Sequence, residues 1–117
     1  MIKKLDQEAI NLILSQNSVL SSLLQAKPRV QKILLSKADK SLVTSICIIV
    51  LNILKGYISV KSTELDNLNK FKQPLRKLVS KSSLKNKRKI LQRGGFVNTI
   101  VPIILGTISV LGSLIEK

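Results

Sequence analysis

Apolar residues recur at spacings of three and four along most of the chain, with polar residues between them. This is the period of an amphipathic α-helix, and no segment shows the clean alternation that is typical of a half-buried strand. The first predicted helix covers residues 5–24, and its apolar positions are Leu5, Ala9, Leu12, Ile13, Leu20, Leu23 and Leu24. The pattern therefore predicts an all-α fold.

A short second helix is predicted to begin at Pro28, a residue that the first turn of a helix tolerates, and to carry Val30, Ile33 and Leu34 on one face. The third has Asp39 as its N-cap and Gly56 as its stop. Between these two, residues 42–54 are apolar nearly all round, so we expect this helix at the centre of a bundle.

The next predicted helix begins with Thr63 and Asp66 at capping-box spacing and continues through residue 79. Pro74 lies inside that pattern, where it removes a hydrogen bond and is expected to kink or split the helix. Ser82 or Ser83 is expected to cap one further short helix, which the Gly94-Gly95 pair ends.

Residues 96–115 carry no charge and would span about 30 Å as a helix, enough to cross the core of a bilayer. Pro102 and several hydroxyl side chains make this segment less apolar than most spanning helices. Gly106, Ser109 and Ser113 share one face, which suits close packing between helices as well as lipid contact. Membrane insertion and burial against protein both remain open for this segment.

With 117 residues the chain is one domain's worth, and an apolar content of 44% with only 3% aromatic residues predicts an aliphatic core. We therefore expect a small aliphatic helical bundle with a basic helical segment and a hydrophobic C-terminal helix. The three parts are a helical body over residues 1–69, the basic segment over 70–95 and the hydrophobic tail over 96–117.

The net charge of +14 is concentrated in the middle part, since residues 70–93 hold ten cations and no acid. Such an excess repels itself unless a polyanion neutralises it. The ten candidate contacts are Lys70, Lys72, Arg76, Lys77, Lys81, Lys85, Lys87, Arg88, Lys89 and Arg93. Seven lysines against three arginines suit phosphate contact more than base reading, and with only Phe71 nearby for stacking the pattern favours duplex over single-stranded nucleic acid.

Signs of catalysis are missing from the sequence, and we expect a protein that is not an enzyme and has no metal or other cofactor. The sequence contains no histidine, and its one cysteine cannot build a zinc site. Cys47 lies in an apolar run and is expected to be a buried small hydrophobe.

The Lys/Arg-rich block that ends in "RGGF", followed by an apolar tail with an early "VPII", resembles the precursor of core protein X, also called mu, of adenoviruses. It is also similar to the X-like proteins of adintoviruses and Maverick or Polinton elements. The resemblance covers roughly residues 38–106. Lys85, Lys87, Arg88, Lys89 and Arg93 match the basic block, and Gly94, Gly95 and Phe96 match the junction.

This resemblance implies a small protein packaged with double-stranded DNA in a virion core, and present in the host nucleus during assembly, that helps to neutralise and condense the genome. It also implies a candidate processing junction at Gly94, Gly95 and Phe96. The family's protease cuts where an aliphatic residue precedes a Gly-containing pair, and Leu91 stands one position too early for that pattern.

Two other functions remain open. In one, the cations meet anionic headgroups and residues 96–115 insert into a membrane. In the other, the chain is a structural adaptor whose tail binds a capsid protein or other copies of itself.

Overall fold

The predicted all-α fold is confirmed by the computed structural model, which describes residues 6–93 and 95–115 and forms eight α-helices and no strand within them. The helices are α1 (Gln7–Ser15), α2 (Asn17–Gln25), α3 (Pro28–Ser36), α4 (Lys40–Leu54), α5 (Ser62–Lys70), α6 (Lys72–Val79), α7 (Leu84–Leu91) and α8 (Phe96–Ile115).

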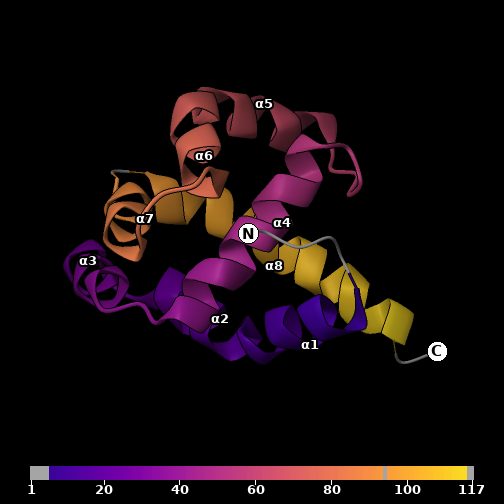
Figure 1. The fold of residues 1–117 in the computed structure, drawn as a ribbon, viewed down its shortest axis with the longest axis horizontal. Coiled ribbons are helices and arrows are strands. Elements are labelled where there is room, and N and C mark those ends of the chain that lie inside the picture. The colour runs from indigo at the N-terminus through magenta and orange to yellow at the C-terminus, as the bar shows by residue number, and fades with distance from the viewer. Residues whose placement is uncertain (1–5, 94, 116–117) are drawn as a thin grey trace.

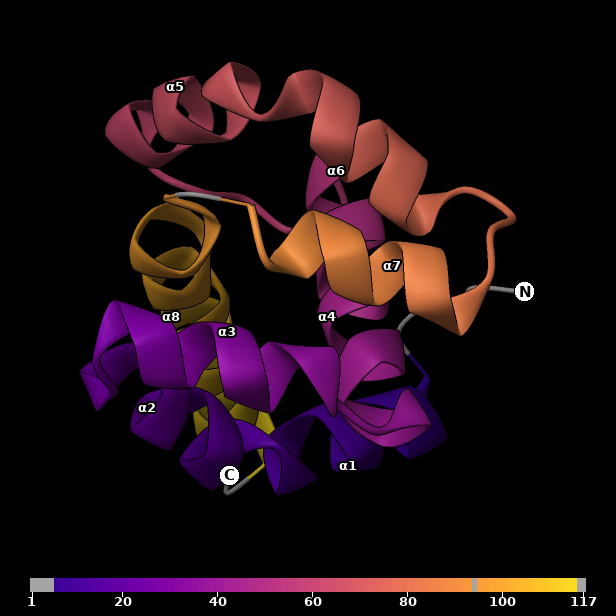
Figure 2. The same ribbon diagram turned by 90° about the vertical axis from the view of Figure 1, so that its left-hand side faces the viewer.

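The eight helices are arranged around α4 and α8, which cross near the centre of the molecule (Figure 1). Figure 2 shows α5 and α6 on one side of α8 and α1, α2 and α3 on the other. Helix α8 contacts α1, α2, α4 and α5, so the last helix of the chain is enclosed by much earlier ones.

Helix α4 lies in the core, as its sequence predicts. The carboxylate of Asp39 accepts a hydrogen bond from the backbone N–H of Leu42 at 2.8 Å, which confirms the expected N-cap. Ten of the fifteen residues in α4 are buried. Two of these are polar, and they are satisfied within the helix: Ser45 donates to the carbonyl of Ser41 and Asn52 to that of Ile48.

The apolar tail is also in the core. Its buried residues are Phe96, Val97, Ile100, Val101, Ile103, Ile104, Thr107 and Ile108, while Asn98, Pro102 and Gly106 are exposed along one side. Because Pro102 is exposed, the backbone hydrogen bond that it removes is lost on the side where water can replace it. Of the two uses left open by the sequence, this structure has residues 96–108 packed against protein, while Ser109 and Val110 are exposed.

Two predicted helices are broken in the structure. The single helix expected over residues 5–24 ends at Ser15, and α2 begins after Gln16. There the hydroxyl of Ser15 bonds to the carbonyl of Leu12, and such local bonds compete with the helical ladder. The second break falls at Phe71, which puts the predicted disruptor Pro74 in the first turn of α6, where its missing N–H costs little.

Helix α5 starts earlier than predicted. The expected cap pair of Thr63 and Asp66 is wrong, because both residues lie inside the helix. Instead, the carboxylate of Glu64 accepts a hydrogen bond from the backbone N–H of Lys61 at 3.1 Å. Ser83 does cap α7, where it accepts a bond from the N–H of Asn86, and Gly95 has a φ of +82° just before α8.

Ile49→Asp tests whether α4 is the centre of the fold. Ile49 is 0% exposed, so the new carboxylate would be buried without a partner, and we expect a loss of unfolding free energy of about 3–5 kcal/mol. Leu65→Asp on α5, where the side chain is 48% exposed, should cost less than about 1 kcal/mol. Urea denaturation of both variants gives the comparison, and similar midpoints would contradict a buried α4.

Candidate nucleic-acid interface

The ten candidate cations are distributed over the end of α5, over α6 and α7, and over the segments that follow α6 and α7. Helices α6 and α7 pack against each other, so the two richest parts of the cluster share one side of the molecule (Figure 2). Eight of the ten are exposed, namely Lys70, Lys72, Arg76, Lys77, Lys81, Lys85, Lys89 and Arg93. These eight residues are called the basic surface below.

A narrow apolar stripe on the same helices packs against the bundle and so turns the basic surface toward solvent. In α6 the side chains of Leu75 and Leu78 are fully buried, and in α7 Leu91 is buried. Because these residues face the bundle, the lysines and arginines between them face solvent.

Lys87 is half-buried and is used inside the protein. Its ammonium group donates to the carbonyls of Leu78 and Ser80, the latter at 2.7 Å. These carbonyls lie at the C-terminal end of α6, where the helix dipole favours a cation. Lys87 therefore caps α6 and is less available to a polyanion than its exposed neighbours.

Arg88 is likewise half-buried, and its Nε donates to the carbonyl of Ala38 at 2.7 Å. Ala38 follows the C-terminal end of α3, so this bond ties α7 to a helix fifty residues earlier. The sequence groups Lys87 and Arg88 with the other eight cations, whereas the structure gives these two internal partners.

The structure also brings in cations that the sequence analysis did not include. Helix α3 packs against α7, and its segment contributes the exposed residues Lys27, Arg29, Lys32 and Lys37, which Lys40 follows at the start of α4. Lys32 and Arg93 line the same hollow of about 180 Å³ between the two helices. The exposed positive charge therefore continues from α7 onto α3. No local signal indicates this, since it depends on which helices pack together.

A larger hollow of about 580 Å³ lies between α4 and the segment that joins α6 to α7. Its rim includes the ammonium-bearing side chains of Lys40, Lys81 and Lys87 together with Ser80 and Ser82. Lys87 and the hydroxyl of Ser80 already donate to backbone carbonyls, so the groups at this rim that are left to meet a phosphate are Lys40, Lys81 and Ser82.

Cys47 borders this hollow and is buried, as its sequence context predicts. Burial raises the pKa of the thiol to about 11, although the nearby charge of Lys87 acts in the opposite direction. A thiol with this pKa stays protonated at neutral pH, so Cys47 lacks the thiolate character of a nucleophile.

The candidate processing junction is partly built into the fold. Gly94 lies outside the described residues, Gly95 is exposed, and Phe96 is buried as the first residue of α8. The ring of Phe96 packs edge-to-face against that of Phe71, with centroids 6.1 Å apart. Phe71 is therefore engaged in the core contact and offers little surface for stacking on a base.

Among the described residues, no single helix has both the length and the apolarity to cross a membrane. Helix α7 and the stretch Phe96–Val110 of α8 reach these values together, but the two are bent by 101°. Within the same residues no three His, Cys, Asp or Glu side chains gather as metal ligands would.

Comparisons with protein-family models, with curated proteins and with solved structures find no match to this chain.

Replacing Arg88 and Lys89, neighbours with different environments, should separate structural from exposed cations. Arg88→Met leaves the carbonyl of Ala38 without its charged donor, so we expect unfolding free energy to fall by about 1–3 kcal/mol. Lys89→Met removes an exposed charge and should change it by less than about 0.5 kcal/mol. Equal effects in urea denaturation would show that the bond from Arg88 does not stabilise the fold.

Proposed function

We propose that this protein binds duplex DNA without sequence preference and neutralises its phosphate charge. The observation that carries the proposal is the basic surface, whose eight cations are exposed on adjoining helices. No acidic residue occurs in the sequence between Asp66 and Glu116, so nothing within that stretch offsets this charge. The cations of α3 extend it further.

The dimensions of the molecule agree with such a role. Its longest extent is 39 Å, and duplex DNA carries about one negative charge per 1.7 Å of helix axis. A stretch of duplex 39 Å long carries about twenty phosphates in all, more than the eight cations of the basic surface. Several copies bound side by side would be needed to condense a genome.

Resemblance to core protein X supplies the proposed biological setting. It supports a protein packaged with double-stranded DNA in a virion core, with the host nucleus as the site of assembly. The large lysine share of the basic surface supports phosphate contact rather than bidentate reading of bases.

Salt dependence tests this proposal. If all eight cations of the basic surface contact phosphates, the slope of log K against log salt concentration should be about −7, and fewer contacts would reduce it in proportion. Lys89→Gln should reduce the magnitude of the slope by about 0.9. Lys55→Gln changes an exposed residue at the C-terminal end of α4 and should leave the slope unchanged. A slope near zero, or strong preference for one sequence, would contradict the proposal.

A second candidate function is membrane insertion, since α7 and the stretch Phe96–Val110 of α8 together reach the length and apolarity of a spanning segment. In this function α8 would have to leave the bundle and expose the core that it now covers. Truncation before α8 cannot test it cleanly, because the same cut would remove Phe96, Ile100 and Ile104 from the core.

Gly106→Lys distinguishes the two functions. Gly106 is exposed and nothing lies within 4 Å of a Cβ added there, so the folded bundle should tolerate the lysine. In a spanning segment the same lysine costs about 2.5–3.5 kcal/mol. If DNA binding is the function, the variant should bind DNA as the parent does. If the parent releases dye strongly from anionic liposomes and Gly106→Lys does not, the result would instead favour insertion.

A further inference from the structure

The hollow of about 580 Å³ between α4 and the segment that joins α6 to α7 runs along one side of the central helix, and it is called the α4 hollow below. The α4 residues that line it recur at helical spacing and form one stripe, namely Lys40, Val43, Thr44, Cys47 and Leu51. From its first residue to its last, this stripe is about 16 Å long. The α4 hollow therefore has an elongated floor that is apolar except at the end where Lys40 lies.

Apolar side chains also form the opposite wall of the α4 hollow. Val79, the last residue of α6, and Leu84, the first residue of α7, are half-buried and line it. Small-molecule sites in proteins are mostly apolar, have volumes of about 300–1,000 Å³ and often lie between the helices of a bundle. The α4 hollow has these properties.

Specific bonds hold the two walls in place. The carbonyl of Leu78, near the end of α6, accepts bonds from the Sγ of Cys47 at 3.5 Å and from the ammonium group of Lys87. Lys87 also donates to the carbonyl of Ser80, so it fixes the start of the segment between α6 and α7. The site is thus formed before a ligand arrives, which reduces the entropy cost of binding.

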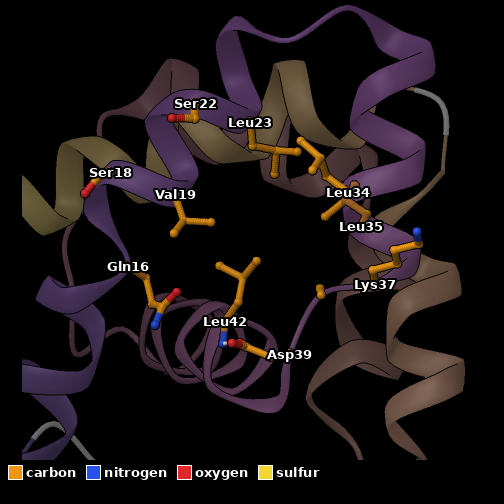
Figure 3. Close-up of a pocket in the computed structure, with 11 residues that line it drawn as sticks. Gln16, Ser18, Val19, Ser22, Leu23, Leu34, Leu35, Lys37, Asp39 and Leu42 are labelled. Carbon is orange, nitrogen blue, oxygen red and sulfur yellow. Dashed lines mark hydrogen bonds between the residues drawn. The ribbon is translucent and has the colours of Figure 1, made fainter.

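The charge around the α4 hollow has one sign. Lys40 and Lys81 are exposed at its rim, Ser82 adds a hydroxyl group, and none of the residues that line it is acidic. The groove of about 440 Å³ between α2, α3 and the start of α4 differs in this respect, since Figure 3 shows both Lys37 and Asp39 at its edge. The α4 hollow therefore favours an anion, whereas the charges that line the groove balance.

We propose that the α4 hollow binds a single-chain anionic amphiphile, with its alkyl chain along α4 and its head group at the lysine rim. Fatty acids and alkyl phosphates share this chemistry, because each joins an anionic acceptor to one flexible apolar chain. Duplex DNA has phosphates but no apolar chain to cover the floor. This proposal therefore does not depend on DNA binding.

Isothermal titration calorimetry of the full chain with decanoate, below its micelle concentration, tests for the site. Affinity should rise about fourfold with each methylene added from hexanoate to decanoate, because each one leaves water for the hollow. Decanol lacks the charge and inorganic phosphate lacks the chain, so each should bind at least about fivefold more weakly than decanoate. Equal binding by either would overturn the proposal. Decyl phosphate is titrated in parallel, and tighter binding of it or of decanoate supports the proposal and identifies the head group.

Lys81→Glu and Lys85→Glu are matched variants, because both lysines are exposed and both changes alter the net charge equally. Lys81 lines the α4 hollow and Lys85 does not. Lys81→Glu should weaken decanoate binding about fivefold or more, and Lys85→Glu should leave it unchanged. Equal affinities of these two variants would overturn the proposal.

Thr44→Phe tests the apolar part of the site. Thr44 is half-buried and lines the α4 hollow, so a phenyl ring there would take up the space of the alkyl chain. Decanoate binding should weaken about tenfold or more, which is the loss of about two buried methylenes. A variant that melts at the temperature of the parent and binds decanoate as tightly would contradict the proposed position of the chain. The lysine pair keeps the proposal testable if Thr44→Phe does not fold.

Discussion

Burial of α8 against α4 and its neighbours is the interaction on which the rest of the structure depends. A chain with a net charge of +14 and few aromatic residues must offset its own repulsion by burying aliphatic side chains. Helices α4 and α8 supply most of the fully buried Ile and Val residues. The basic helices α6 and α7 contribute only narrow apolar stripes, so they depend on this core to hold them in place.

The position of α8 also explains its unusual composition. Asn98, Pro102 and Gly106 recur every four residues and fall on the exposed side, while the aliphatic residues between them face the bundle. A helix that meets lipid on all sides gains nothing from such a polar stripe, whereas a helix on the edge of a bundle places it in water. The sequence alone leaves both uses open because length and mean apolarity are the same in each.

Most features that depend on neighbouring residues could be predicted from the sequence, although the cap pair of Thr63 and Asp66 was wrong, and most features that depend on packing could not, apart from the central place of α4. Asp39, Ser83 and Pro28 have the expected places at helix starts because a cap is a local bond or a local backbone restriction. Gln31 of α3 is buried and donates to the carbonyl of Leu23 in α2, the partner of Arg88 lies fifty residues away, and the two partners of Lys87 lie nine and seven residues away. Charge counting identified the basic surface but could not separate its eight exposed members from Lys87 and Arg88.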